Sequence, residues 1–108
     1  MPGALHFVTG NVLNRKPIFK QEKYWLAFLE ELQKMRTERA CKIIAFILMP
    51  DHLHFISNPK GGDIQTSTGV LKSFAAKAIV DLAPKNYFLV DGENQVWQES
   101  FKTLPLWS

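Results

Sequence analysis

Cysteine and long apolar runs are scarce in this sequence. It contains one cysteine, Cys41, so no disulfide can form within the chain, and this count fits a reducing compartment. No apolar run approaches the roughly 18 residues that a membrane-spanning helix needs, and the N-terminus lacks the layout of a signal peptide. Internal repeats and low-complexity tracts are missing as well. We therefore predict a cytoplasmic protein that makes no membrane contact.

The composition is that of one small globular domain. The chain has 108 residues, of which 46% are hydrophobic and 21% are charged, and these values argue against wholesale disorder. A formal net charge of +3 permits a polyanionic partner without requiring one. Nothing marks a domain boundary, so we predict that residues 1–108 form a single domain.

Two histidines stand one residue apart in a strand-like segment, residues 42–56. Two apolar runs flank a Pro-Asp pair there, which is typical of a β-hairpin. Because side chains alternate along a strand, His52 and His54 should share one face while Leu53 and Phe55 share the other. The two imidazoles would be rooted about 6–7 Å apart, close enough to bind one divalent cation. The plainer alternative is two unrelated, partly exposed histidines.

The remaining segments complete an α+β pattern. Apolar periodicity predicts strands at residues 5–13 and 95–101, helices at 20–38 and 64–82, and a short strand or loop at 86–91. Gly10 within the first strand indicates a bulge or a close backbone approach, and Tyr24 lies on the apolar stripe of the first helix as a packing residue.

The order strand, helix, strand, strand, helix, strand predicts a ferredoxin-like sandwich. In this fold a four-stranded antiparallel sheet carries both helices on one face. The histidine-bearing strand would be central beside the first strand, with His52 and His54 on the open face. A shift of one residue in the register of that strand would overturn this placement.

Two tracts resemble one protein family. The tract from Met49 to His54, Met-Pro-Asp-His-Leu-His, resembles the His-hydrophobic-His motif of the HUH endonucleases. More narrowly, it resembles the motif of the IS200/IS605-type and REP-associated single-tyrosine transposases. The tract from Val96 to Phe101, Val-Trp-Gln-Glu-Ser-Phe, resembles the Leu-Trp-Gln-x-x-Phe/Tyr strand of that family. The resemblance covers nearly all of the chain.

The resemblance implies a metal-dependent reaction on single-stranded DNA. Members of the family cut DNA beside an imperfect hairpin by attack of a tyrosine phenolate on phosphorus, and they work as homodimers. His52 and His54 would bind Mg²⁺ or Mn²⁺ together with an oxygen ligand. Gln98 and Glu99 are both open for that third position.

The family's DNA contacts map onto two basic segments. Asn14, Arg15 and Lys16 occupy the position of the loop that lies near bound DNA. Lys72 and Lys77 lie on the polar flank of the second predicted helix, where the family carries residues that touch the DNA backbone. A solvated turn and solubilising lysines would explain the same residues without DNA.

The chain departs from the family at its C-terminal end. The family's tyrosine lies on a helix beyond the Trp-Gln strand, but this sequence ends seven residues after Phe101 with a tail that contains Pro105 and no tyrosine. Tyr87 follows the second predicted helix, which is the wrong place for the family's tyrosine, so it is only a weak catalytic candidate. Because the tail lacks the tyrosine helix, we expect a domain that is truncated at its C-terminal end relative to the family.

Three functions remain open at this point. The first is a transposase domain with impaired cleavage, and the second is a non-catalytic nucleic-acid-binding module of the same fold. The third is a small ferredoxin-like protein that binds a metal or ligand without nucleic acid.

Overall fold

The computed structural model describes residues 5–38, 41–59, 64–99 and 101–106. The main elements are β1 (Leu5–Asn11), α1 (Glu22–Glu38), β2 (Cys41–Leu48), β3 (His52–Pro59), α2 (Ile64–Leu82) and β6 (Lys102–Leu106). Short 3-10 turns at Leu13–Arg15 (η1) and Ile18–Lys20 (η2) link β1 to α1, and a small hairpin of β4 (Leu89–Val90) and β5 (Glu93–Asn94) follows α2.

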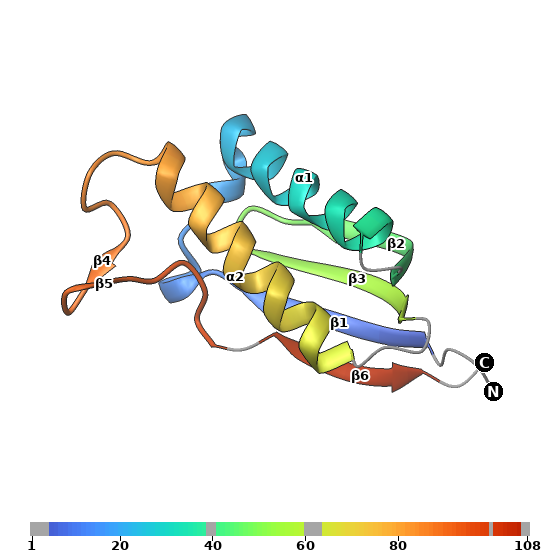
Figure 1. Ribbon diagram of the computed structural model, residues 1–108. Coiled ribbons are helices and arrows are strands. Elements are labelled where there is room, and N and C mark those ends of the chain that lie inside the picture. The colour runs from blue at the N-terminus through green and yellow to red at the C-terminus, as the bar shows by residue number, and fades with distance from the viewer. Residues whose placement is uncertain (1–4, 39–40, 60–63, 100, 107–108) are drawn as a thin grey trace.

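The four long strands form one antiparallel sheet in the order β2-β3-β1-β6. Both α1 and α2 lie on the same face of this sheet, as Figure 1 shows, and the other face carries no helix in the described part of the chain. The architecture is the predicted ferredoxin-like sandwich. Strand β3 is central and pairs with β1, which confirms the expected place of the histidine-bearing strand.

The prediction of a final strand at residues 95–101 is wrong. Among its described residues, 95–99 and 101, that segment makes an isolated bridge between Val12 and Trp97 and no strand, and the fourth strand of the sheet is β6. Val96 and Trp97 are consecutive and both buried, at 2% and 6% exposure, so they do not follow the alternation of a strand. Pro105 fits in β6 because this strand lies at the sheet edge, the place in a sheet where proline is tolerated.

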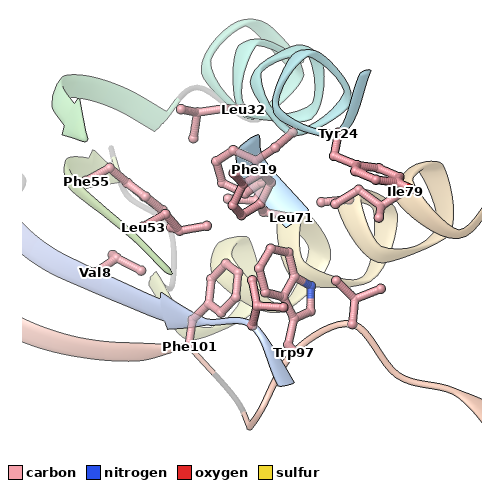
Figure 2. Close-up of a cluster of buried hydrophobic side chains, with 14 of the residues drawn as sticks. Val8, Phe19, Tyr24, Leu32, Leu53, Phe55, Leu71, Ile79, Trp97 and Phe101 are labelled. Atoms are coloured by element: carbon pink, nitrogen blue, oxygen red, sulfur yellow. The ribbon is translucent and has the colours of Figure 1, made fainter. Parts of the chain in front are cut away.

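The core fills the space between the sheet and the two helices (Figure 2). Tyr24 is 1% exposed and meets Phe88 edge to face, so its predicted packing role is confirmed. Trp97 reaches between Phe28 and Phe101, and its indole Nε1 donates to the carbonyl of Lys72 at 3.0 Å. This bond ties the segment before β6 to α2.

No helix in the described residues is long and apolar enough to cross a membrane.

Candidate functional site

The two histidines lie on the open face of the sheet. Leu53 and Phe55 are each 1% exposed and point into the core, so the alternate residues of β3 face away from the helices. The rings of His52 and His54 have centroids 5.1 Å apart and are inclined by 75°. The predicted juxtaposition of the pair is therefore present in the structure.

Each histidine is held through its Nδ1 atom. His52 Nδ1 donates to Asp51 Oδ1 at 2.7 Å, and His54 Nδ1 shares a hydrogen bond of 3.1 Å with Thr9 Oγ1. Thr9 stands directly opposite His54 in the register of β1 and β3. The ring of His54 also stacks on Phe7, with centroids 5.1 Å apart and planes inclined by 19°.

Because Nδ1 of each ring is engaged by the protein, Nε2 is the atom through which either ring could bind a metal. Histidines that bind metals commonly donate their other ring N–H to a carboxylate or another oxygen, which fixes the orientation of the ring. Asp51 fills this role for His52, and Thr9 fills it for His54. The pair thus fits a divalent cation as two prepared nitrogen ligands.

The charge states suit the same purpose. Burial, and secondarily the charge of His52, lowers the pKa of His54 below its ordinary value, which favours the neutral imidazole that a metal requires. Hydrogen bonds from His52 and Arg15 lower the pKa of Asp51. Asp51 is therefore a carboxylate at neutral pH and accepts from both neighbours.

The basic loop between β1 and α1 reaches the histidines through Asp51. Arg15 Nε donates to Asp51 Oδ2 at 3.0 Å. The backbone adds two links, because Val12 N donates to the carbonyl of Asp51 and Phe19 N donates to that of Pro50, each at 3.0 Å. The structure therefore brings a predicted DNA-contacting residue next to a predicted metal ligand.

The other two residues of that loop point to different partners. The backbone N–H of Asn14 donates to Gln98 Oε1 at 2.8 Å. Lys16 Nζ donates to the carbonyl of Tyr87 at 3.4 Å and lies 5.0 Å from the centre of its ring. Tyr87 itself is 43% exposed and packs on Phe88.

Lys72 and Lys77 lie on the helix side of the sheet, opposite the face that carries the histidines. Both belong to α2, which covers the opposite face of the sheet (Figure 1). Lys77 is exposed and Lys72 is half-buried. Lys72 lines a surface pocket together with Gln98, whose side chain holds Asn14, so Lys72 lies near one end of the loop although it belongs to the helix layer.

A third metal ligand is not supplied by an acidic cluster. In the described ranges, no group of three or more His, Cys, Asp or Glu residues could hold a metal ion. Glu99 forms an ion pair with Lys102 at 3.4 Å. Gln98 is linked by its backbone N–H to Asn11, which stands opposite His52, and its side chain holds Asn14.

Sequence reasoning missed Thr9, Phe7 and the role of Asp51. The role of Asp51 could have been predicted from the sequence, because Asp51 directly precedes His52 and a carboxylate is a common hydrogen-bond partner of a metal-binding histidine. Thr9 and Phe7 carry no such signal, because their place beside His54 depends on the register between strands 45 residues apart.

Comparisons with known proteins place this arrangement in a family. The model of the family "Transposase IS200 like" matches residues 4–106, and the chain belongs to this family of transposases.

Two solved structures share the fold. One is a REP-associated tyrosine transposase bound to a REP hairpin, with a TM-score of 0.75 and 21% identity over 100% of this chain. The other is a candidate transposase from Deinococcus radiodurans R1, with a TM-score of 0.80 and 15% identity over 98% of this chain. The chain spans 59% of the first of these proteins and 81% of the second. No curated protein matches it.

Proposed function

We propose that this protein binds single-stranded DNA that carries a hairpin, and that His52 and His54 form the protein part of a metal site for transposase-type cleavage. One observation carries the proposal: His52 and His54 lie side by side on the open sheet face with Nδ1 of each engaged by the protein, and Asp51 links His52 to the Arg15 loop. Family membership and the REP hairpin bound by a structural neighbour support the choice of DNA.

The metal would be Mg²⁺ or Mn²⁺ held by His52 and His54, and it would polarise the scissile phosphate as a Lewis acid. The chain's own residues prepare the site. Asp51 and Thr9 orient the rings, and the lowered pKa of His54 keeps that imidazole neutral. Arg15 is 57% exposed, so its guanidinium is available to the DNA backbone.

We further propose that cleavage through a tyrosine is impaired in this chain. Its two tyrosines are Tyr24 and Tyr87. Tyr24 is buried in the core, where a phenolate could not reach a phosphate. Tyr87 is accessible, but its ring packs on Phe88 and under Lys16. On this proposal, residues 1–108 form a single domain of the family's fold, and a non-catalytic DNA-binding module is the alternative.

The decisive experiment uses end-labelled single-stranded DNA with a hairpin, incubated with the protein with and without Mn²⁺. A native gel at several salt concentrations measures binding, and a denaturing gel detects a covalent adduct. The matched control is a DNA strand of the same length and base composition, with its sequence scrambled so that it cannot form a hairpin.

We expect salt-sensitive binding of the hairpin strand and little or no adduct. Absence of hairpin binding at low salt would overturn the proposal and leave a metal or ligand site without nucleic acid. A strong Mn²⁺-dependent adduct that His52→Ala abolishes would overturn the impairment, and Tyr87→Phe would then test the nucleophile. Mn²⁺ binding is also measured in the absence of DNA. A protein that binds Mn²⁺ has a metal site, whereas the non-catalytic DNA-binding module is expected to bind no Mn²⁺.

We also propose that the protein forms a homodimer through the free edge of β2. This edge strand exposes Ile44, Phe46 and Ile47 at 53%, 49% and 59%. An exposed apolar edge strand offers unpaired backbone groups and apolar area to a second chain. The register shift between Ile43 and Ala45 makes Ile44 a bulge residue, and this irregularity lies within the proposed surface.

Light scattering after size exclusion tests this surface. Ile44→Lys should shift the mass from dimer to monomer, whereas Leu104→Lys on the opposite edge strand should not, although Leu104 is equally exposed at 59%. A monomeric wild-type protein, or equal masses for the two variants, would exclude the β2 edge.

A further inference from the structure

A chain of hydrogen bonds runs from Arg15 through Asp51 to His52. Asp51 uses one carboxylate oxygen for each neighbour, with Oδ2 accepting from Arg15 Nε and Oδ1 accepting from His52 Nδ1. The two bonds measure 3.0 Å and 2.7 Å. A single carboxylate therefore connects the proposed DNA-binding loop to a proposed metal ligand.

The loop holds Arg15 in a strained backbone conformation. Asn14 and Arg15 have φ values of 54° and 55°, in the left-handed region that non-glycine residues rarely adopt. Such a conformation persists only where surrounding contacts enforce it. Here Gln98 Oε1 holds the Asn14 N–H, and Val12 and Phe19 are bonded to the carbonyls of Asp51 and Pro50. In this loop conformation the Arg15 guanidinium bonds Asp51.

The Nη groups of the Arg15 guanidinium form a second edge that could bind another anion. Within the described residues it bonds Asp51 through Nε alone, and the side chain is 57% exposed. Arginine can bind two anions at once because its donors form a planar fork. A phosphate on the Nη groups and Asp51 on Nε would share one arginine.

We propose that Arg15 and Asp51 are positioning residues that couple DNA binding to metal binding at His52. This inference rests on the proposed function. A phosphate bound by the outer edge of Arg15 immobilises the guanidinium, which fixes Asp51 and thereby the orientation of the His52 ring. Coupling of this kind is reciprocal, so DNA raises the affinity for the metal by the same factor by which the metal raises the affinity for DNA.

The test measures the dissociation constant of Mn²⁺ with and without the hairpin strand, by calorimetry or by the electron paramagnetic resonance signal of free Mn²⁺. The ratio of the two constants is the coupling factor. It is measured for the wild type, Arg15→Gln, Asp51→Asn and the double variant. Asp51→Asn keeps an oxygen for His52 Nδ1 but places an N–H donor against Arg15, so it breaks the Arg15 link selectively.

Lys16→Gln is the matched control. Lys16 is the next residue of the same loop, but its Nζ bonds the carbonyl of Tyr87 and not Asp51. This variant removes the same charge as Arg15→Gln, so it should weaken hairpin binding while leaving the coupling factor unchanged. Circular dichroism and thermal melts verify that all variants are folded.

We expect a wild-type coupling factor of roughly fivefold or more. Arg15→Gln and Asp51→Asn should each lower it, and the double variant should lower it no further. Direct ligation of the metal by a DNA phosphate predicts the same factor in all four proteins, and that result would overturn the inference while leaving the proposed function intact. Failure of the wild type to bind the hairpin would overturn both.

Discussion

Replacing Gly10 by alanine should destabilise the protein, although alanine normally favours folding over glycine. A Cβ atom at Gly10 would lie 2.6 Å from Phe101 Cε1, 2.9 Å from Cδ1 and 3.0 Å from Cζ. Phe101 is 5% exposed and packs edge to face on Trp97 at 5.0 Å, so its ring has little room to move. The close approach expected at Gly10 is thus that of an aromatic ring onto the strand.

The magnitude follows from two opposing effects. Overpacking of a filled core costs about 1–3 kcal/mol. The reduced backbone freedom of the unfolded chain returns about 0.5–1 kcal/mol. We therefore expect Gly10→Ala to lower the free energy of unfolding by about 1–2 kcal/mol. Gly69→Ala is the matched control, because nothing lies within 4 Å of a Cβ there and the site is inside α2. It should raise stability by about 0.5–1 kcal/mol.

Urea denaturation followed by tryptophan fluorescence measures these changes. The variant Phe101→Leu relieves the clash, so the combined Gly10→Ala/Phe101→Leu protein should lose less stability than the sum of the single variants. Contacting residues show such non-additivity at about 0.5–3 kcal/mol. A Gly10→Ala protein as stable as Gly69→Ala, or strictly additive losses, would refute the packing of Phe101 on Gly10.

Three further predictions concern the site and its support. Thr9→Val removes the hydroxyl partner of His54 Nδ1; it should weaken Mn²⁺ binding about 10–100-fold in calorimetry with little change in urea stability. The pKa of His54, measured by NMR titration, should lie below 6.5. In His52→Gln this pKa should rise only part of the way back to 6.5, because burial is the larger cause of its lowering and the charge of His52 the smaller. Since folded His54 binds protons less readily than the unfolded chain, its contribution should make stability increase with pH between its lowered pKa and 6.5. Trp97→Phe removes the bond to the Lys72 carbonyl; it should cost about 1–3 kcal/mol in urea denaturation.

The sequence was informative where local pattern and global topology agree. Alternation around Leu53 and Phe55 placed the two histidines on the open face, because burying those two residues leaves only one register for β3. The order of elements then made β3 central. The same logic failed for residues 95–101, since Trp97 and Phe101 enter the core from an irregular segment that is joined to the end of β1 and the residues after it by a Trp97–Val12 bridge and single backbone bonds.

Contacts between distant residues could not be predicted. Arg15 and Asp51 are 36 residues apart, and nothing in the sequence indicates that Arg15 adopts a positive φ and bonds Asp51. Asparagine tolerates the left-handed region and so is compatible with the φ of Asn14, but arginine carries no such indicator. Basic residues on α2 resembled those of the loop in composition, yet only the loop meets the histidine-bearing strand.

The division of β3 into two faces separates stability from chemistry in a testable way. Its buried residues, Leu53 and Phe55, hold the strand against the helices and so also set the positions of His52 and His54. Changes in the core should therefore impair both folding and metal affinity. Thr9 and Asp51 lie on the partly exposed side, where they contact the rings and little of the core. Changes there should lower metal affinity alone, because the hydrophobic contacts that stabilise the sheet remain intact.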